Sequence, residues 1–431
     1  IQFSPDYKDQ PFWWERTPRP DLGKPDLPAD ADVVIVGSGY TGLNAAMQTS
    51  RRGLHTVVLD EDDAGYGCSS RNGGQISTSI KPQYPELTKR YGADAAMAIL
   101  KEGNKALNWV ETVVTENNLD CSFRRSGRFY GAHSPQALND LRTRISQTPA
   151  ELGHESYILE RDQQHEEIGS DFYHGGMVHP HHASIDPGAY HQGLLGCAQQ
   201  SGTEIIPHCR VTEIVRKGDS FKVTTSRGTL RAKDVIVATS GYTSNVTPWQ
   251  QHRIIPIGSY IIATEPLRDD VAKRLIPKNR VITDTLDLVV YYRFCPEHKR
   301  VLFGGRVSLN ETNTKECAPR LRALMIDRFP ELEETKITHC WMGFVGYTFD
   351  HMPHVGKHDG VYYSMGYCGS GVSLASYYGS KVGLKVAGDP EAETAIDGIK
   401  FPGRFYYRGN PWFLAPSIFY YRMKDRLSST R

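Results

Sequence analysis

The hydrophobic residues of this chain follow two different patterns. In the first, a short unbroken apolar run leads through glycines into apolar residues at helical spacing. Val33–Val36 is such a run, and Leu43–Ser50 after it predicts a helix. A second apolar run then ends at Asp60. This order predicts a β-α-β unit whose parallel strands are buried on both faces.

The same pattern returns later in the chain. Val235–Ala238 is an apolar run followed by small residues, and Gly360–Met365 leads through a glycine-rich turn into a predicted helix at Ser373–Ala387. Asp186-Pro187 predicts the start of another helix, which Gly202 ends. Because the carboxyl ends of parallel strands lie at one edge of a sheet, we expect the residues after these strands to lie together.

The second pattern consists of β-rich runs between residues 253 and 342, with a helical stretch at Pro319–Phe329. Residues 85–119 and 135–152 are predicted to be helical, and Phe123–Gly131 is predicted to be a strand. We expect the β-rich runs to form a separate, mainly antiparallel sheet; they are Ile254–Thr264, Leu288–Phe294 and Val301–Gly305.

The length of 431 residues exceeds one compact core, so the chain is expected to form two joined domains. The predicted fold class is α/β, or α+β overall, with a Rossmann-like domain on a parallel central sheet and a substrate domain on a mainly antiparallel sheet. The Rossmann-like domain is assigned residues 30–82, 180–250 and 346–395, and the substrate domain residues 83–179 and 251–345. Residues 1–29 and 396–431 are predicted to be covering arms.

Composition narrows the range of partners. The 50 basic and 49 acidic residues nearly cancel, which gives no reason to expect nucleic acid or an anionic membrane surface. No apolar run is long enough to span a bilayer, and the first 30 residues lack a signal-peptide core. We therefore expect a soluble cytoplasmic protein, and the oligomeric state stays open.

Neither the cysteines nor the histidines form a metal-binding pattern. The eight cysteines include no C-x-x-C pair, which favours reduced thiols over disulfides or a zinc site. The cluster His179-Pro-His-His182 lacks the i, i+4 spacing of a zinc-binding helix. No metal is therefore expected.

A dinucleotide-binding motif lies at the start of the β-α-β unit. Gly37, Gly39 and Gly42 form G-x-G-x-x-G directly after the apolar run. These glycines provide the tight turn, the backbone approach to a pyrophosphate and the close packing of the helix. Asp60, eighteen residues past Gly42, is placed to accept the ribose hydroxyls. A Gly-, Ser- and Asn-rich loop at 62–75 follows, and its backbone amides can wrap a large cofactor.

Further motifs extend over nearly the whole chain. They include Ala-Thr-Ser-Gly-Tyr-Thr at 238–243 and Gly-Tyr-Cys-Gly-Ser-Gly-Val at 366–372. Together with the β-α-β unit they resemble the D-amino-acid oxidase and glycine or sarcosine oxidase family of FAD enzymes. The gamma-glutamylputrescine oxidoreductase branch is the most similar, through Phe12–Trp14, Gly67–Gln75, Tyr291–Arg293, Leu302–Arg306, Thr348–Gly356 and Asn410–Trp412.

The resemblance implies FAD as the cofactor. The pyrophosphate would lie on the first glycine turn, the ribose at the acid after the second strand, and the flavin ring between the loop and the second glycine turn. The implied cofactor-binding residues are Gly37, Ser38, Gly39, Tyr40, Thr41, Gly42, Asp60, Glu61, Gly67, Cys68, Ser69, Ser70, Arg71, Asn72, Gly73, Gly74, Gln75, Val211, Thr239, Gly241, Gly369, Ser370, Gly371 and Val372.

Some members of this family attach FAD through a cysteine or a histidine. By the resemblance, Gly343 stands where sarcosine oxidases carry the cysteine, with Cys340 three residues earlier. Arg71 stands where dimethylglycine-type relatives carry the histidine. We therefore expect FAD without a covalent link, although Cys68 and Cys368 near the expected flavin keep such a link open.

The second sheet is expected to supply the substrate cage. Aromatic rings there can shield an amine, and an arginine can bind a carboxylate. Strand alternation puts Tyr291 and Arg293 on one face and Tyr292 on the other, so only one set can face the flavin. For each residue, packing within the sheet is the alternative. The candidates are Tyr260, Tyr291, Tyr292, Arg293, Arg306 and Trp341, with His351 and His354 as possible proton acceptors.

Only one dinucleotide motif is present, so the flavin is expected to receive its electrons from the substrate. We expect oxidation of the C–N bond of a primary or secondary amine or amino acid by hydride transfer to flavin N5, giving an imine that hydrolyses. O2 is the simplest acceptor and would give hydrogen peroxide. One alternative is a dehydrogenase that reduces a quinone or carrier protein. Another is a flavin-holding subunit of a larger complex, whose ends at 11–28 and 401–421 would be docking surfaces.

Overall fold

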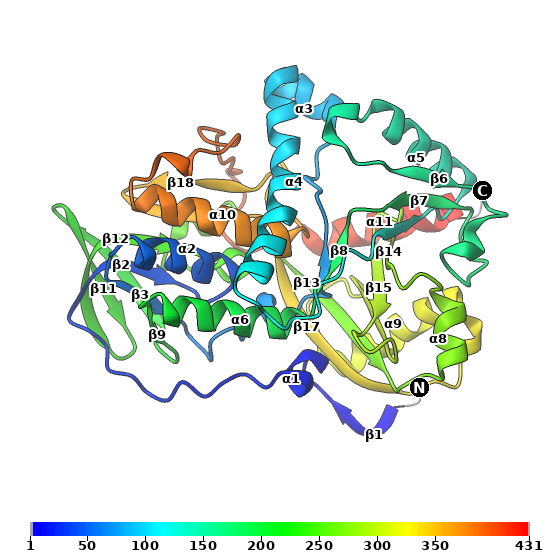
Figure 1. The fold of residues 1–431 in the computed structure, drawn as a ribbon, viewed down its shortest axis with the longest axis horizontal. Coiled ribbons are helices and arrows are strands. Elements are labelled where there is room, and N and C mark those ends of the chain that lie inside the picture. Colours follow the sequence, from blue (N-terminus) through cyan, green and yellow to red (C-terminus); the bar gives the residue numbers. More distant parts are fainter. Residues whose placement is uncertain (1–2, 430–431) are drawn as a thin grey trace.

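The computed structural model describes residues 3–429, which build two large sheets (Figure 1). The first sheet has eight strands: β2 (Asp30–Val36), β3 (Thr56–Leu59), β9 (Glu204–Ile206), β10 (Val211–Lys217), β11 (Ser220–Thr225), β12 (Gly228–Val237), β18 (His354–His358) and β19 (Val361–Met365). Their order is β10-β11-β12-β2-β3-β9, and β19 pairs with β12 and β18. Strands β12, β2, β3 and β9 are parallel neighbours, as the β-α-β pattern predicts.

The second sheet has nine strands and is mainly antiparallel. They are β1 (Phe3–Lys8), β5 (Arg128–Gly131), β6 (Tyr157–Leu159), β7 (Gly176–His179), β13 (Ile255–Thr264), β14 (Val281–Asp284), β15 (Val290–Phe294), β16 (Val301–Gly305) and β17 (Ile337–Tyr347). Their order is β1-β17-β13-β16-β15-β14-β5-β7-β6, in which only β1–β17 and β14–β5 are parallel. A small third sheet pairs β4 (Gln75–Ile76) with β8 (Ala183–Ser184).

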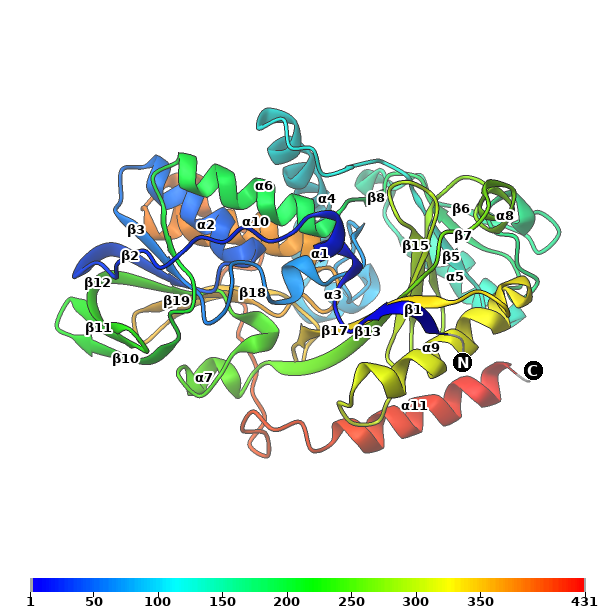
Figure 2. The same ribbon diagram turned by 90° about the horizontal axis from the view of Figure 1, so that it is seen from below.

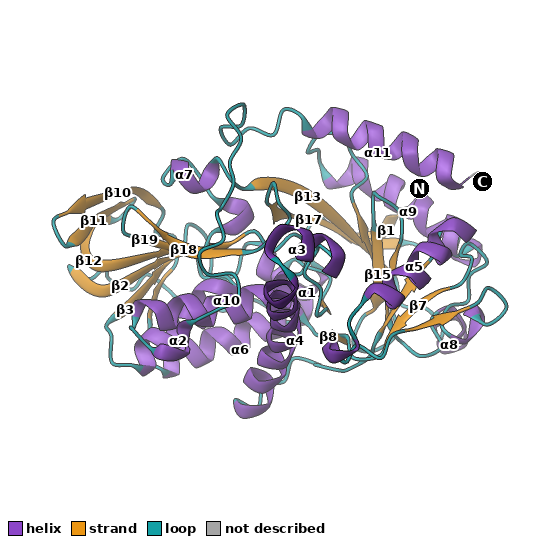
Figure 3. Ribbon diagram, turned by 90° about the horizontal axis from the view of Figure 1, so that it is seen from above, coloured by secondary structure: helices purple, strands orange, loops and turns teal. Residues whose placement is uncertain are grey.

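Helices cover both sheets. They are α1 (Phe12–Arg16), α2 (Tyr40–Arg51), α3 (Tyr84–Tyr91), α4 (Ala93–Glu116), α5 (Pro135–Gln147), α6 (Pro187–Gln200), α7 (Pro248–Gln251), α8 (Asp269–Leu275), α9 (Thr314–Arg328), α10 (Gly371–Val386) and α11 (Leu414–Ser429). Helices α2, α6 and α10 lie along one face of the eight-stranded sheet, as Figure 3 shows. Helices α9 and α11 run near each other beside the nine-stranded sheet (Figure 2). None of the helices within residues 3–429 has the length and apolar character needed to cross a membrane.

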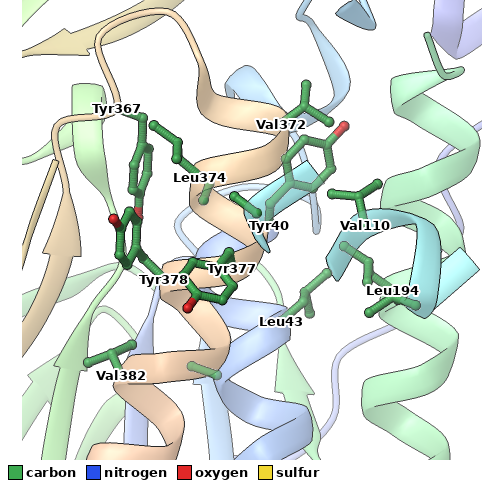
Figure 4. Close-up of a cluster of buried hydrophobic side chains, with 14 of the residues drawn as sticks. Tyr40, Leu43, Val110, Leu194, Tyr367, Val372, Leu374, Tyr377, Tyr378 and Val382 are labelled. Carbon is green, nitrogen blue, oxygen red and sulfur yellow. The ribbon is translucent and has the colours of Figure 1, made fainter. Parts of the chain in front are cut away.

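The β2 strand is buried on both faces, which explains its unbroken apolar sequence. Val33 and Ile35 pack toward α2, α4, α6 and α10, whereas Val34 packs in a separate core with residues of β3 and β10–β12. Side chains from four helices meet in the first core (Figure 4); they include Tyr40 and Leu43 of α2, Val110 of α4, Leu194 of α6 and Leu374, Tyr377, Tyr378 and Val382 of α10.

The structure differs from the sequence-based prediction in several boundaries. The predicted helix at 85–119 is divided into α3 and α4 by Gly92, whose φ of +88° interrupts the helical backbone. The predicted strand Phe123–Gly131 begins only at Arg128. Helix α9 starts earlier than predicted because the Asn313 side chain caps it, and Pro319 lies inside it.

The predicted fold class is confirmed. The division of the chain into domains stays a prediction. The two predicted arms also contribute secondary structure to the fold. The predicted N-terminal arm supplies the edge strand β1 and helix α1, and the C-terminal arm supplies α11.

Candidate functional site

A cavity of about 880 Å³ is lined by residues of both large sheets. It begins beside Gly37 and Asp60, at the carboxyl ends of β2 and β3, and extends to Arg128 on β5 and His179 on β7. Its volume falls in the range of sites that bind small molecules and cofactors. The sequence predicted ligand contacts at the ends of these strands. All of these strand ends border one continuous cavity.

The turn between β2 and α2 leaves no room for side chains at its glycines. Gly37 has a φ of +103°, which other residues rarely adopt. A methyl group on Gly42 would overlap the carbonyl oxygen of Gly37, and one on Gly39 would lie 2.9 Å from Ser69 Oγ. Helix α2 thus starts close to the strand, and its first residues line the cavity. The N–H of Tyr40 donates to Ser69 Oγ over 3.0 Å, and the positive end of the helix favours a bound anion.

The carboxylate of Asp60 is fixed at the end of β3. Ser38 donates its backbone N–H and its hydroxyl to Asp60 Oδ2, over 2.8 and 2.5 Å. The backbone N–H of Asp62 donates to Oδ1 over 3.2 Å. Burial raises the pKa of Asp60, and these hydrogen bonds oppose the shift. Asp60 lies in the cavity wall, where its lone pairs can accept ribose hydroxyls.

Three tryptophans hold the loop at 67–75 from outside the cavity. Each indole N–H donates to a group of the loop, so the loop is held at three consecutive residues. Trp14 donates to Ser70 Oγ over 2.7 Å, Trp341 to the Arg71 carbonyl over 2.7 Å, and Trp13 to the Asn72 carbonyl over 2.9 Å. The loop is therefore a preformed part of the site.

Several polar residues that the sequence analysis did not assign to substrate line the part of the cavity near the nine-stranded sheet. They come from loops, β5, β7 and α5, and they are Lys81, Arg128, Tyr130, Arg144, His179 and His182. The C-terminal arm also reaches the cavity, through Leu414, Ser417, Ile418 and Tyr421 of α11. Within residues 3–429 no three His, Cys, Asp or Glu side chains gather as metal ligands would.

A glycine cradle at a helix N-terminus, an acid beside it and a long cavity fit a dinucleotide with a further ring system. Residues 32–382 match the DAO family, described as FAD dependent oxidoreductase. The chain belongs to this family of FAD dependent oxidoreductases. The family and the cofactor predicted from the motifs are thereby confirmed, and the chain is an oxidoreductase that uses FAD.

Two relatives are similar to this member of the DAO family over most of its length. The gamma-glutamylputrescine oxidoreductase of Escherichia coli strain K12 is 30% identical over 404 residues, which cover 92% of this chain and 93% of the relative. The probable oxidoreductase OrdL of Haemophilus influenzae is 29% identical over 379 residues, 86% of each chain. The crystal structure of glycine oxidase from Geobacillus kaustophilus has the same fold, with a TM-score of 0.72, 17% identity, and coverage of 88% of this chain and all of that one.

Most of the residues implied to bind FAD line the cavity. Those in the wall are Gly37, Gly39, Tyr40, Thr41, Asp60, Glu61, Gly67, Cys68, Ser69, Arg71, Asn72, Gly73, Gln75, Val211, Thr239, Gly241, Gly369, Ser370, Gly371 and Val372. Ser38, Gly42, Ser70 and Gly74 do not line it. Ser38 holds Asp60, Gly42 permits the approach of α2, and Ser70 donates to the Gly65 carbonyl. Gly74 has a φ of +65° and no space for a side chain.

Two candidates for the substrate cage, Tyr260 and Tyr292, lie on the opposite face of the nine-stranded sheet. Tyr260 donates its hydroxyl to the Thr312 carbonyl over 2.8 Å, and Tyr292 stacks on Phe303 with 5.0 Å between ring centroids. Both belong to the apolar core that the sheet forms with α9. Strand alternation decides this placement, because the neighbouring Tyr291 lines the cavity.

Trp341 and Arg293 also do not line the cavity but hold the loop at 67–75 instead. Arg293 is buried and donates Nη1 to the carbonyls of Gly74 and Ile185, over 2.8 and 2.7 Å. Burial lowers its pKa to about 10. Arg293 and Trp341 are therefore positioning residues for the loop at 67–75.

Tyr291, Arg306 and His351 do line the cavity. The Tyr291 ring lies over Gly304, where a side chain would collide with it, and its hydroxyl is 2.9 Å from Ser259 Oγ. His354 is buried elsewhere, with Nε2 3.1 Å from the Asp350 carboxylate and its ring stacked on Phe401. Only His351 of the two histidines thus faces the cavity.

Acid is expected to weaken FAD binding through His191. Its Nε2–H donates to the Ser38 carbonyl over 2.7 Å, and burial lowers its pKa to about 4. The unfolded chain binds this proton near pH 6.5, so stability is lost as the pH falls from 6.5 to 4, by up to about 3 kcal/mol. Urea unfolding and FAD fluorescence between pH 7.5 and 4.5 measure the loss.

The variant His191→Gln is the matched test, because an amide also donates to the Ser38 carbonyl but does not titrate. We expect it to retain FAD further into the acid range than the parent protein. An identical pH profile in both proteins would show that His191 is not the responsible group.

Proposed function

We propose that this chain oxidises the C–N bond of a primary or secondary amine or amino acid, giving an imine that hydrolyses to a carbonyl compound and an amine. The observation that carries the proposal is the continuous cavity, which joins the glycine turn to the polar side chains near β5 and β7. The name of the Escherichia coli relative and that of the structural neighbour support an amine or amino acid as the donor. A substrate similar to gamma-glutamylputrescine or sarcosine is our specific proposal.

The wall residues would hold FAD along the cavity. We propose that Gly37–Thr41 bind the pyrophosphate, that Asp60 binds the adenosine ribose and that Val211 contacts the adenine. The loop at 67–75 and the turn at 369–372 would enclose the flavin ring. FAD, when bound, would supply the two-electron oxidant that the removal of a hydride from the carbon beside the amine nitrogen requires.

The chain itself must orient a neutral amine and exclude water. Tyr291 offers the face of its aromatic ring to the substrate, and its hydroxyl is already hydrogen-bonded to Ser259. Burial lowers the pKa of His351, which keeps its imidazole neutral at pH 7 and able to accept a proton from a substrate ammonium. We propose His351 as this proton acceptor, since it is a titratable group of the cavity wall without a direct hydrogen-bond partner in the described chain.

An anaerobic absorbance titration tests the function. We expect amines to bleach the flavin band of the holoprotein, and admission of air to restore it with formation of hydrogen peroxide if O2 is the acceptor. A reduced protein that stays bleached in air but recovers with a quinone would replace the oxidase by the dehydrogenase alternative. A yellow protein that none of gamma-glutamylputrescine, sarcosine, glycine or D-alanine bleaches would overturn the proposal and favour a flavin-holding subunit.

We further propose that FAD is held without a covalent bond. Burial raises the pKa of Cys68 and of Cys368 to about 11, so both side chains are protonated thiols at neutral pH and poor nucleophiles. Cys340 lies in the core beneath the nine-stranded sheet and does not line the cavity. Gly343, where a Cβ would lie 3.5 Å from Cys68 Sγ, carries no thiol of its own.

Precipitation with trichloroacetic acid is accordingly expected to release all of the flavin into the supernatant. A yellow pellet would contradict this expectation. The variants Cys68→Ser and Cys368→Ser would then identify the attached residue, because only one of them would return the flavin to the supernatant.

A further inference from the structure

Basic side chains meet at the β5 end of the cavity. Arg128 on β5 lies opposite His179 on β7, and His182 stacks on His179 with 4.6 Å between ring centroids. Arg144 reaches the same space from α5, with its guanidinium carbon 5.8 Å from the centroid of the Tyr130 ring. All of these residues line the cavity. Chain segments that lie far apart in the sequence therefore form one basic group.

Within residues 3–429, no carboxylate forms an ion pair with Arg128 or Arg144. Arg128 donates Nη1 to the Thr283 hydroxyl over 2.9 Å, whereas its Nε lacks any hydrogen-bond partner within residues 3–429. His182 Nδ1 also lacks a partner there. Burial lowers the pKa of Arg128 to about 10, and the nearby Arg144 acts in the same direction. A guanidinium with little solvent and an unused donor is suited to an anionic ligand.

Arg306, another arginine of the cavity wall, also has an Nε without a partner within residues 3–429, but its charge is balanced. Arg306 donates Nη1 to Glu311 Oε1 over 2.6 Å and to the Gly258 carbonyl over 2.7 Å, so its charge is already compensated. Asp287, an acid in the same wall, is paired with Lys424. Two other cations of the wall also lack an ion pair within residues 3–429: Arg71 donates to the Tyr66 and Met342 carbonyls, and Lys81 lies over the Tyr347 ring. At the β5 end, the positive charges without an acid are those of Arg128 and Arg144.

Strand pairing gives the separation between this group and the flavin loop. Tyr291, next to Gly73 of the loop, pairs with Thr283, and Thr283 pairs with Tyr130. Two interstrand spacings, about 10 Å in all, therefore separate Tyr291 from Tyr130. Arg128 lies two residues from Tyr130 on the same face of β5. This separation of the strands favours a substrate longer than an α-amino acid.

We propose that Arg128 and Arg144 bind a carboxylate at the far end of the substrate, so that the enzyme prefers long amines with a terminal acid over α-amino acids. Thr283 and the pair His179 and His182 complete the hydrogen bonding around this carboxylate. The proposal rests on the amine oxidation proposed above, and it moves the carboxylate contact from Arg293 and Arg306 to Arg128 and Arg144.

Ligand binding without turnover tests the subsite. Glutarate and its neutral diamide are titrated into the FAD-loaded protein, and the shift of the flavin absorbance gives Kd for each. We expect glutarate to bind at least about 10-fold more tightly than the diamide, and Arg128→Gln to weaken glutarate by about 10- to 100-fold with little change for the diamide. Equal affinities for both ligands in the parent protein would overturn the proposal.

Matched variants separate a local effect from misfolding. Arg144→Gln alters a partly exposed residue of the same subsite and is expected to weaken glutarate about 10-fold even if Arg128→Gln fails to fold. Arg142→Gln alters an exposed arginine of α5 that is paired with Glu160, and it should leave glutarate binding unchanged. Loss of affinity in Arg142→Gln, or none in Arg144→Gln, would refute the assignment.

Flavin reduction by 5-aminopentanoate and by pentylamine distinguishes the two proposals. We expect faster reduction by the acid, with the preference abolished in Arg144→Gln. If neither amine reduces the flavin while glutarate still binds through Arg128 and Arg144, the oxidation fails and the subsite stands. If both amines react equally, the subsite fails and the oxidation stands.

Discussion

Gly42→Ala is expected to give a protein that is purified without FAD. A methyl group at this position would overlap the Gly37 carbonyl, and a backbone atom cannot rotate away as a side chain can. Helix α2 must therefore shift from β2, which moves the N–H groups at its start away from the pyrophosphate. We expect FAD affinity to fall by at least about 100-fold, and stability by about 1–3 kcal/mol from overpacking. The ratio of absorbance at 450 and 280 nm, with FAD reconstitution, measures the effect.

Gly196→Ala provides the control for this prediction. Gly196 lies in α6, and a methyl group there would contact nothing within 4 Å. Because alanine favours a helix more than glycine does, we expect unchanged FAD content and a gain of up to about 1 kcal/mol. Normal FAD affinity in Gly42→Ala would show that the close approach of α2 to β2 is not required for binding.

Arg328→Met is expected to destabilise the protein by about 3–5 kcal/mol, because it leaves the Asp284 carboxylate buried and unpaired. Arg328 Nη2 donates to Asp284 Oδ2 over 2.7 Å, and the two side chains are 1% and 0% exposed. Arg328 Nε also donates to the Tyr173 hydroxyl over 3.2 Å. Urea unfolding of the FAD-loaded protein at pH 8 measures the loss.

The loss should be smaller at pH 5. Burial raises the pKa of Asp284 to about 6 even with Arg328 present, so ionisation of this group opposes folding as the pH rises above the ordinary value near 4. Without Arg328 that opposition extends to higher pH. Arg268→Met, which removes an exposed partner of Asp270, should cost less than about 1 kcal/mol at either pH. A loss equal to that control would refute the role of the buried pair.

The sequence was sufficient for the cofactor end of the molecule because the pattern there is local. The strand, the glycine turn, the helix and Asp60 lie within thirty-one residues, and each residue type has one geometric role. The loop at 67–75 follows directly. What the sequence did not reveal is that Trp13, Trp14 and Trp341 hold this loop, since their contacts join distant segments.

The substrate end was less predictable because it depends on the order of strands in a sheet. Alternation correctly separates Tyr291 from Tyr292 but does not say which of them faces α9. Arg128 and His179 become neighbours only because β5 pairs with β7. No spacing in the sequence predicts that pairing. The sequence analysis considered His179-Pro-His-His182 only as a metal site.

The contribution of α11 to the cavity wall bears on how enzymes of this kind diverge. Leu414, Ile418 and Tyr421 line the cavity, yet they lie beyond residue 382, where the match to the family ends. The glycine turn that would hold FAD and part of the cavity wall are thus encoded at opposite ends of the chain. The segment after residue 382 can therefore change without a change in the glycine turn, so relatives with the same turn can differ in this part of the cavity wall.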